Sequence, residues 1–192
     1  MTEICLVRHG ETDWNAIGRL QGSTDIPLNN NGKYQARECG EFLAKDKWDL
    51  IVTSPLMRAR QTAEIISNIV RIPMVEMSEF VERHFGDAEG MTVQERTTTF
   101  PDKKYINVEE WEDLISRVTI GLEKITQNYK SKRVIVVAHG AVINAILAEL
   151  SNGEVGSEKT RLVNACINNI AFSEGKWNIK DFNQVTHLSQ FR

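Results

Sequence analysis

Three short apolar runs in this sequence share one arrangement: each ends in a polar turn and is followed by a stretch of helix-forming residues. The runs cover residues 4–7, 50–53 and 134–138. Continuous apolar runs rich in β-branched residues, bounded by turns and followed by helices, are typical of buried parallel strands. The pattern therefore predicts an α/β protein in which these three strands point in the same direction.

Helices are predicted over residues 32–45, 56–70 and 141–150, and over a stretch that ends near residue 129. In that last stretch the apolar residues recur every three or four positions, at Trp111, Leu114, Val118, Leu122, Ile125 and Tyr129. Asn107 precedes Glu110 by three residues and is expected to start this helix with a capping box. Ser54 is expected to cap the 56–70 helix, with Pro55 at its first position.

The rest of the chain has fewer signals. Residues 168–173 and 176–182 are predicted as a terminal β-hairpin around Glu174-Gly175. Residues 83–106 are weakly patterned, and a short helix is expected near Thr92-Val93-Gln94-Glu95. Because no internal repeat or low-complexity linker divides the sequence, residues 1–192 are interpreted as a single domain.

Composition excludes some classes of partner. The 192 residues are 41% hydrophobic and 26% charged, and the formal net charge is −3. These values are ordinary for a soluble globular protein. A chain without a global positive field is not expected to bind nucleic acid or an anionic membrane surface. An anionic substrate would need a local pocket of positive charge.

Cysteine usage and hydropathy predict a cytoplasmic protein. Cys5, Cys39 and Cys166 form no C-x-x-C pair and leave an odd thiol, which argues against a disulfide framework and favours a reducing compartment. The N-terminal apolar run is too short for a signal peptide. The longest uncharged run, residues 134–148, is shorter than a membrane span and is interrupted by His139-Gly140.

Polar residues of compatible chemistry follow the three predicted strands. Because parallel strands end at one edge of a sheet, Arg8, His9, Arg58 and His139 are expected to meet there, beside helix N-termini. Arginine forks and histidines at such an edge suit a phosphoryl group. The residues taken one at a time have plainer interpretations, as solvated arginines and a buried structural histidine. Periodicity alone does not decide between these readings.

The motif Arg8-His9-Gly10-Glu11-Thr12 resembles the R-H-G signature of the histidine phosphatase superfamily, also called the phosphoglycerate mutase-like family. The resemblance continues in order along nearly the whole chain. The matching stretches are Trp14-Asn15, Arg19-Leu20-Gln21-Gly22, Asp25-Ile26-Pro27-Leu28, Ser54-Pro55 with Arg58-Ala59 and Thr62-Ala63, Glu82-Arg83-His84-Phe85-Gly86, Glu89-Gly90 and Val137-Ala138-His139-Gly140. A lone R-H-G motif is a weak signal, but this ordered set is a strong one.

The resemblance implies a three-layer α/β/α sandwich with a mixed, mostly parallel central sheet. It also implies that His9 attacks the phosphoryl group and becomes a transient phosphohistidine. Arg8, Arg58 and His139 would hold the phosphoryl oxygens, and Glu82 would protonate the leaving alcohol and then activate water. The remaining substrate-binding residues implied by the motifs are Asn15, Gln21, Gly22 and Gly140.

No metal or cofactor is predicted. The sequence has no G-x-x-x-x-G-K phosphate loop, no H-E-x-x-H zinc helix, and no cysteine followed by five residues and an arginine. Arg8 and Arg58 beside the two histidines argue against a bound cation. The expected partner is a small phosphorylated metabolite, and the sequence does not predict an oligomeric state.

Phosphatase is the predicted activity, and cofactor-dependent phosphoglycerate mutase is the alternative. The stretch between Glu82 and His139 lacks the longer basic insertion of such mutases, and Gln21-Gly22 resembles the phosphatase branch. In contrast, the motif that begins at Glu82 resembles the mutase form. A binding protein built on a retired catalytic fold is a third hypothesis, against which the intact set of motif residues counts.

Broad specificity is predicted, since no dedicated recognition element is found in the sequence. More specific relatives, such as an α-ribazole phosphatase or a sugar bisphosphatase, remain as alternatives. In the segment 83–106, four basic residues would contact a carboxylate or second phosphate of the substrate, or would simply be solvated: Arg83, Arg96, Lys103 and Lys104.

Overall fold

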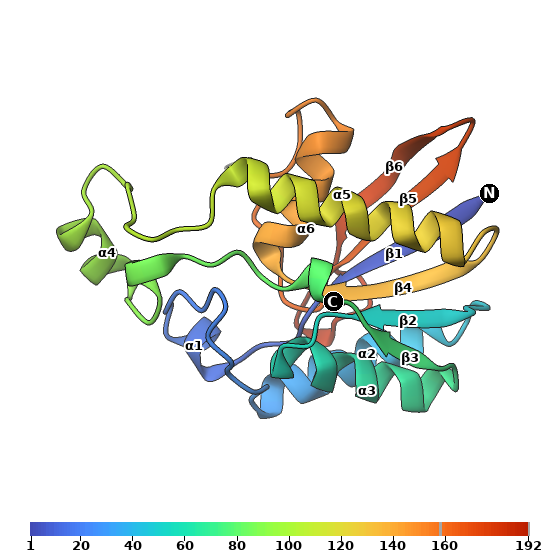
Figure 1. The fold of residues 1–192 in the computed structure, drawn as a ribbon. Coiled ribbons are helices and arrows are strands. Elements are labelled where there is room, and N and C mark those ends of the chain that lie inside the picture. The colour runs from blue at the N-terminus through green and yellow to red at the C-terminus, as the bar shows by residue number, and fades with distance from the viewer. Residues whose placement is uncertain (158, 192) are drawn as a thin grey trace.

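The computed structural model describes residues 1–157 and 159–191. Within these residues, six strands form one sheet in the order β3-β2-β4-β1-β5-β6 (Figure 1). The strands are β1 (Thr2–Arg8), β2 (Leu50–Thr53), β3 (Met74–Glu76), β4 (Arg133–Ala138), β5 (Ile167–Ser173) and β6 (Lys176–Gln184). The strands β1 to β4 are parallel, and β5 and β6 are antiparallel to their neighbours. The predicted mixed, mostly parallel sheet is confirmed, and so is the terminal hairpin.

Helices cover both faces of the sheet, as Figure 1 shows. They are α2 (Asn30–Leu43) and α3 (Met57–Val70) on one face, and α5 (Trp111–Asn128) and α6 (Gly140–Leu150) on the other. Alternate residues of each central strand enter two separate apolar clusters. In β1, Cys5 and Val7 pack with α2 and α3, while Ile4 and Leu6 belong to the cluster that contains α5 and α6. A strand buried on both faces has no polar positions, which is why these runs are continuously apolar.

Short elements gather beyond the carboxyl ends of the parallel strands. They are α1 (Asp13–Ala16), the 3-10 turns η1 (Ser78–Phe80) and η2 (Gly86–Ala88), and α4 (Val93–Thr99), with η3 (Ser189–Phe191) near the C-terminus. The short helix expected near Thr92 is α4, and Thr92 and Glu95 form its capping box. Figure 1 shows that α4 projects away from the sheet on the same side of the molecule as α1.

Two predicted helix caps were wrong. Asn107 does not cap α5, which begins at Trp111 with Glu110 in the N-cap position and no side-chain cap. Asn107 has a left-handed backbone (φ 58°), and its side-chain amide donates to Asp87 Oδ1 at 3.1 Å. A residue outside the helix with its side chain bonded elsewhere cannot cap it, so the capping-box spacing was misleading here.

Ser54 was also expected to cap α3, but Leu56 is the N-cap residue and it makes no side-chain cap. The Ser54 hydroxyl accepts from the Leu56 N–H at 3.3 Å and contacts His139 Nε2 at 2.8 Å. The hydroxyl is therefore bonded to His139, at the end of the neighbouring strand β4, and does not cap the helix. The 32–45 helix was placed two residues too late, because Asn29 caps α2 through its side chain on the Gly32 N–H.

Among the helices of the described chain, none combines the length and apolar character needed to cross a membrane. The three cysteines, Cys5, Cys39 and Cys166, are buried and free.

Candidate active site

The carboxyl ends of three neighbouring strands are in register. Arg8 at the end of β1 pairs with Ala138 at the end of β4, and Thr53 at the end of β2 pairs with Val137 of β4. The next residue of each strand is therefore His9, His139 or Ser54. The structure brings the two histidine rings together, with centroids 5.2 Å apart and planes inclined by 55°.

His9 is buried and has a fixed tautomer. Its Nδ1 lies 2.7 Å from the Gly10 carbonyl oxygen, which only accepts, so Nδ1 carries the proton and Nε2 keeps its lone pair. Burial, together with the positive charges of Arg58 and Arg8, lowers the pKa of His9 well below its ordinary value of 6.5. At neutral pH His9 is thus an uncharged imidazole with a free Nε2, as a nucleophile requires.

His139 lies in the same electrostatic environment. Burial lowers its pKa well below 6.5, and the charge of Arg58 adds to this effect. Its Nε2 contacts the Ser54 hydroxyl at 2.8 Å, whereas its Nδ1 is buried without a hydrogen-bond partner among the described residues. One ring nitrogen is therefore held in place while the other is left for a ligand.

Arg58 is held by two backbone carbonyls. Its side chain, on the first turn of α3, is buried with 1% of its surface exposed. The NH1 group donates to the Thr24 carbonyl at 2.8 Å, and NH2 donates to the Gly22 carbonyl at 2.6 Å. Burial lowers the pKa of Arg58 from its ordinary value, but a guanidinium stays charged in proteins. The carbonyls fix the orientation of the charge without neutralising it.

Arg8 is fixed in a similar way at the end of β1. Its NH1 donates to the Leu162 carbonyl at 2.5 Å, and its Nε has no partner. Buried nitrogens without a partner also occur at Arg58 Nε and His139 Nδ1. Buried polar atoms in proteins are nearly always hydrogen-bonded, so such a group needs an explanation. A ligand with several acceptor oxygens would supply these partners.

Glu82 lies at the N-terminus of α6, next to His139. Its carboxylate accepts from the backbone N–H groups of Ala141 at 3.1 Å and Val142 at 3.2 Å, and from that of Arg83 at 2.9 Å. Only 9% of Glu82 is exposed. The positive end of the helix and these donors hold the carboxylate at the edge of the sheet where the two histidines lie.

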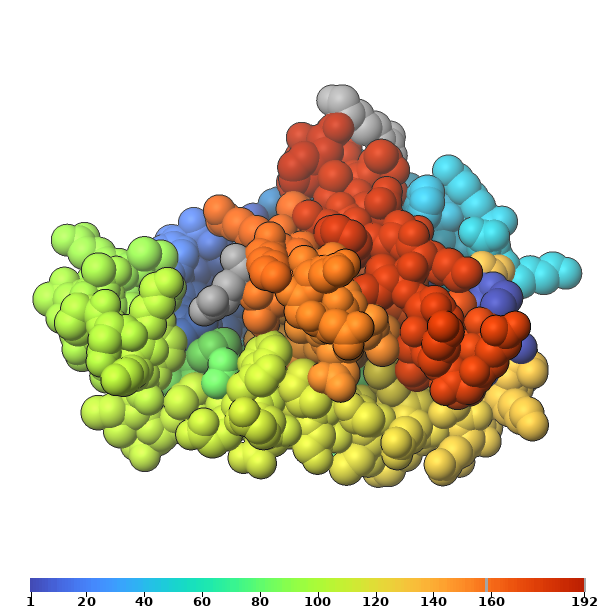
Figure 2. All heavy atoms as spheres, turned by 90° about the horizontal axis from the view of Figure 1, so that it is seen from above, coloured from blue at the N-terminus to red at the C-terminus, as the bar shows by residue number. Residues whose placement is uncertain are grey.

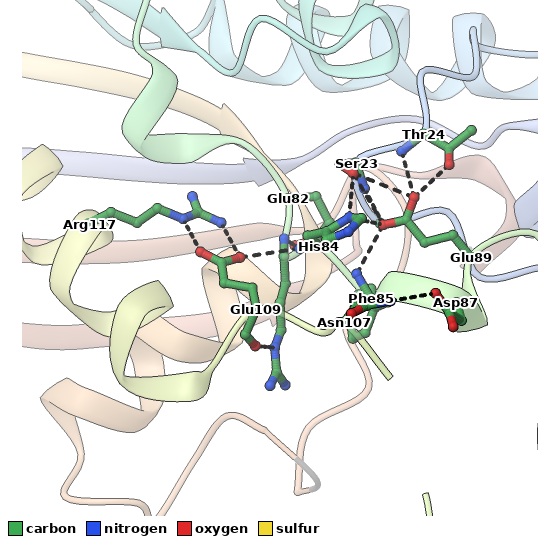
Figure 3. A network of polar contacts seen from close by, with 12 residues as sticks. Ser23, Thr24, Glu82, His84, Phe85, Asp87, Glu89, Asn107, Glu109 and Arg117 are labelled. Atoms are coloured by element: carbon green, nitrogen blue, oxygen red, sulfur yellow. Dashed lines mark hydrogen bonds and ion pairs between the residues drawn. The ribbon is translucent and has the colours of Figure 1, made fainter. Parts of the chain in front are cut away.

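A second carboxylate, Glu89, joins the two loops that carry these groups (Figure 3). It accepts from the backbone N–H groups of Ser23 at 2.9 Å and Thr24 at 3.1 Å, and from that of Phe85 at 2.9 Å. Burial raises the pKa of Glu89, but the hydrogen bonds from Thr24, Phe85 and Ser23 outweigh burial and hold the pKa below 4.5. The sequence motif contained Glu89 without assigning it a role.

Gly22 makes this junction possible. It has a left-handed backbone with φ of 54°, and a Cβ at this position would collide with the Glu89 carboxylate. The Gly22 carbonyl accepts a hydrogen bond from the Arg58 guanidinium, and the N–H of the next residue, Ser23, donates to the Glu89 carboxylate. Glu89 therefore positions the carbonyls that hold Arg58, and it ties them to the loop that begins at Glu82.

Asn15 and Gln21 are both bonded to Thr12, which caps α1. Asn15 Oδ1 accepts from the Thr12 N–H at 3.1 Å and from Asn164 Nδ2 at 3.2 Å. Gln21 Oε1 accepts from the Thr12 hydroxyl at 2.7 Å, and Gln21 is 7% exposed. The Thr12 hydroxyl thus orients the amide of Gln21. Asn15 connects α1 to Asn164, in the segment before β5.

A pocket of about 520 Å³ opens beside Arg8. It is lined by Arg8, Asn15, Gly140, Asn144, Lys159, Thr160, Arg161, Leu162 and Asn164. Sequence reasoning identified the first three, but it missed the irregular segment 159–164, which carries no motif and no periodicity. The only available signal in the sequence was the loss of hydrophobic periodicity just before the strand predicted over residues 168–173.

The basic residues of segment 83–106 lie outside this pocket. Arg83 Nε donates to the Glu109 carbonyl at 2.9 Å, and Arg96 NH1 donates to the Met91 carbonyl at 2.7 Å. Lys104 pairs with Asp102, and Lys103 lines a separate, smaller hollow near α4. Within the part of the chain that the structure describes, no group of three or more His, Cys, Asp or Glu side chains is arranged to hold a metal ion.

Comparison with known proteins shows the family of this chain. The family profile of the histidine phosphatase superfamily (branch 1) matches residues 4–185. The chain belongs to the histidine phosphatase superfamily. The resemblance read from the motifs is therefore confirmed.

Relatives in the superfamily cover nearly the whole chain. An uncharacterized phosphatase, PhoE, of Bacillus subtilis (strain 168) is 56% identical over 191 residues, which are 100% of this chain and 99% of the relative. A metal-independent phosphoserine phosphatase of Arabidopsis thaliana is 35% identical and is aligned over 98% of this chain and 84% of its own length.

Solved structures of the superfamily have the same fold. YhfR of Bacillus stearothermophilus superposes with a TM-score of 0.90 at 26% identity, over 97% of this chain and 99% of that protein. Phosphoserine phosphatase from Entamoeba histolytica, in complex with 3-phosphoglyceric acid, superposes with a TM-score of 0.86 at 30% identity, over 98% of this chain and 100% of that protein. The predicted phosphoglycerate mutase-like fold is confirmed.

Proposed function

We propose that this protein is a metal-independent phosphatase that hydrolyses small phosphomonoesters of several kinds through a phosphohistidine on His9. The observation that carries the proposal is the set of buried nitrogens without partners, Arg8 Nε, Arg58 Nε and His139 Nδ1, around an uncharged His9. A tetrahedral dianion has enough acceptor oxygens to bond to all of them. Membership of the superfamily and the name of the Bacillus subtilis relative support the same activity.

In the first half of the reaction, His9 Nε2 attacks phosphorus and the bond to the leaving oxygen breaks. Glu82 in its protonated form gives its proton to the departing alcohol, and the phosphoryl group stays on His9. Arg8 and Arg58 stabilise the charge on the phosphoryl oxygens, because their orientation is fixed before the substrate arrives. The negative charge of the substrate also favours the protonated form of His139, which then donates from Nδ1.

In the second half, the Glu82 carboxylate takes a proton from water as the water attacks phosphorus. The bond between phosphorus and His9 Nε2 breaks, phosphate leaves, and His9 returns to its uncharged form. The hydrogen bond from Nδ1 to the Gly10 carbonyl keeps the ring in the same orientation throughout.

Phosphoglycerate mutase is the second candidate. The motif at Glu82 resembles the mutase form, and one 32% identical relative from Arabidopsis thaliana is named phosphoglycerate mutase-like protein 4. The two activities differ in whether water reaches the phosphohistidine. The pocket that Arg8 lines is open to solvent at the exposed residues Lys159 and Arg161, so water can approach Arg8, the neighbour of His9 in the chain, which supports the phosphatase alternative.

The test follows two products at once. Purified protein is incubated with 3-phosphoglycerate and excess chelator, and inorganic phosphate and 2-phosphoglycerate are measured together, with His9→Ala in parallel. We expect phosphate from the unmutated protein and none from the variant. Formation of 2-phosphoglycerate, especially after priming with the bisphosphate, would establish the mutase instead, and activity that returns only with a divalent ion would contradict the metal-free proposal.

The covalent step is tested by trapping. The chain has four histidines, so the position of an acid-labile, alkali-stable phosphoryl label can be assigned by substitution. We expect the label to be lost in His9→Ala and retained in His84→Ala, whose side chain is exposed. A label that persists in His9→Ala would place the nucleophile elsewhere. Comparable rates across several small phosphomonoesters are expected, and a thousandfold preference for one would contradict broad specificity.

A further inference from the structure

The pocket beside Arg8 has a positively charged rim that phosphoryl transfer does not use. Lys159 and Arg161 are exposed, and both line the pocket together with Arg8 and Gly140. No Asp or Glu occurs among the lining residues that the structure describes. In Figure 2 the segment after α6 is orange, and the segment that follows β1 is blue. The blue segment lies deeper than the orange segment beside it.

Arg161 has no partner for its charge within residues 1–157 and 159–191. Its backbone carbonyl accepts from Asn183 Nδ2 at 3.3 Å, but no hydrogen bond or ion pair involves its guanidinium. Burial lowers the pKa of Arg8, and the like charge of Arg161 adds to this effect. The two arginines therefore repel each other across the pocket, and an anion between them would remove that repulsion.

The backbone around Arg161 is fixed relative to Arg8. The Leu162 carbonyl accepts from Arg8 NH1 at 2.5 Å, and the Thr160 carbonyl accepts from Asn144 Nδ2 at 3.1 Å. On the other side, the Val163 N–H donates to Asn183 Oδ1 at 3.0 Å. The backbone that carries Arg161 is therefore anchored on both sides, and its neighbour Leu162 is bonded directly to Arg8.

Arg8 itself points to a ligand in this pocket. Its Nε is buried and lacks a partner, and a Cβ on Gly140 would lie 3.6 Å from that nitrogen. Gly140 therefore lies next to this unpartnered nitrogen, and Gly140 and Arg8 both line the pocket. An anion bound there can reach Arg8 with one group and the rim with another.

We propose that Arg161, assisted by Lys159, binds a second anionic group of the substrate, a carboxylate or a second phosphate, while Arg8 holds the phosphoryl group to be transferred. This inference rests on the proposed phosphatase function and specifies its substrate class. Arg161 is the principal residue, because Lys159 Nζ already donates to the Gly153 carbonyl. Esters with uncharged tails are still hydrolysed, since the rim is separate from His9, but they are bound less tightly.

The test compares substrates that differ only in the second anionic group. The carboxylate pair is 3-phosphoglycerate and glycerol 3-phosphate, and the phosphate pair is fructose 1,6-bisphosphate and fructose 6-phosphate. We expect Arg161→Gln to lower kcat/KM about tenfold for the substrate that carries the second anionic group, in at least one pair. The loss should come from a higher KM. For the other substrate of that pair, kcat/KM should change by less than about twofold. The pair that loses discrimination identifies the group as carboxylate or phosphate.

Lys130→Gln is the matched control. Lys130 is exposed and lies beside the start of β1, at the opposite end of the sheet, so the variant removes one positive charge far from the pocket. We expect no change in discrimination for Lys130→Gln, and a smaller loss for Lys159→Gln than for Arg161→Gln. Equal effects of Arg161→Gln on both members of each pair, or equal effects of Arg161→Gln and Lys130→Gln, would overturn the subsite while leaving the phosphatase intact.

Failure of the proposed function has a different signature. If no phosphomonoester is hydrolysed, binding of 3-phosphoglycerate and glycerol 3-phosphate to His9→Ala protein is measured by calorimetry, with and without Arg161→Gln. Preference for 3-phosphoglycerate that disappears with Arg161→Gln would support the subsite on a protein that is not a phosphatase. Equal affinity for the two compounds would overturn it.

Discussion

His9 and His139 lie side by side at the ends of β1 and β4, with ring centroids 5.2 Å apart. Burial lowers the pKa of each ring well below 6.5, and the charge of Arg58 lowers both further. Two neutral imidazoles between fixed guanidinium groups form a site whose net positive charge comes from the arginines alone. A dianion suits this site better than a cation does, and His9 keeps its lone pair at the pH of a cell.

The pKa shifts of His9 and His139 predict how stability depends on pH. Their pKa values are lower in the folded protein than in the unfolded chain, so below pH 6.5 the unfolded chain binds more protons. The contribution to stability is complete above pH 6.5 and is lost as the pH falls below it, with a slope of about 1.4 kcal/mol per pH unit for each histidine. Urea unfolding across this range measures the slope. His139→Asn should reduce it, and an unchanged slope in this variant would contradict the assignment.

Arg58→Lys should lower kcat/KM by roughly a hundredfold, because lysine cannot bond to the Gly22 and Thr24 carbonyls and to a phosphoryl oxygen with a planar group. Steady-state kinetics with one small phosphomonoester measures the loss. Arg60→Lys is the control on the same helix, where the side chain is 43% exposed. Similar kinetics for the two variants would show that the carbonyl-held geometry of Arg58 is unimportant.

Glu89→Gln should destabilise the protein by about 1–3 kcal/mol, since an amide nitrogen would face N–H donors that now bond to a carboxylate oxygen. It should also lower kcat, because the Gly22 and Thr24 carbonyls that orient Arg58 belong to the segment that Glu89 holds. Denaturant unfolding and kinetics are measured on the same preparation. Glu64→Gln, at an exposed ion pair on α3, serves as the control, and a kcat equal to that of the control would rule out a positioning role.

Comparing Gly22→Ala with Gly175→Ala separates the cost of a strained backbone from the cost of a steric clash with Glu89. Both glycines have positive φ, at 54° and 78°, so each substitution costs about 1–2 kcal/mol of left-handed strain. At Gly175 a Cβ would meet nothing within 4 Å, whereas at Gly22 it would displace the Glu89 carboxylate. Gly22→Ala should therefore cost about 1–3 kcal/mol more in unfolding free energy, and it should also impair catalysis. Equal losses in the two variants would mean that Glu89 moves freely.

The sequence by itself determined the parallel core and the edge at which chemistry occurs. The runs that became β1, β2 and β4 are apolar at every position because both faces of these strands are buried, and such runs can be recognised from sequence. The polar residues after the strands were placed together by the direction of parallel strands alone. The ordered motifs then identified the superfamily.

Helix starts were less predictable, because a cap depends on where one side chain points. Asn107 and Glu110 have the spacing of a capping box, yet Asn107 bonds to Asp87. Ser54 precedes a helix, yet its hydroxyl is bonded to His139 on another strand. In both cases a contact with a residue distant in sequence prevailed over a local preference of about 1 kcal/mol.

Only the tertiary structure decided how the arginines are held and where the pocket opens. Arg58 is fixed by carbonyls of a loop more than thirty positions earlier, and Arg8 by the Leu162 carbonyl far along the chain. Neither contact leaves a periodic trace, since backbone carbonyls are present at every residue. The role of Glu89 and the position of Arg161 were missed for another reason. Charged residues in irregular segments look solvated in the sequence, and only packing shows which of them lie beside a site.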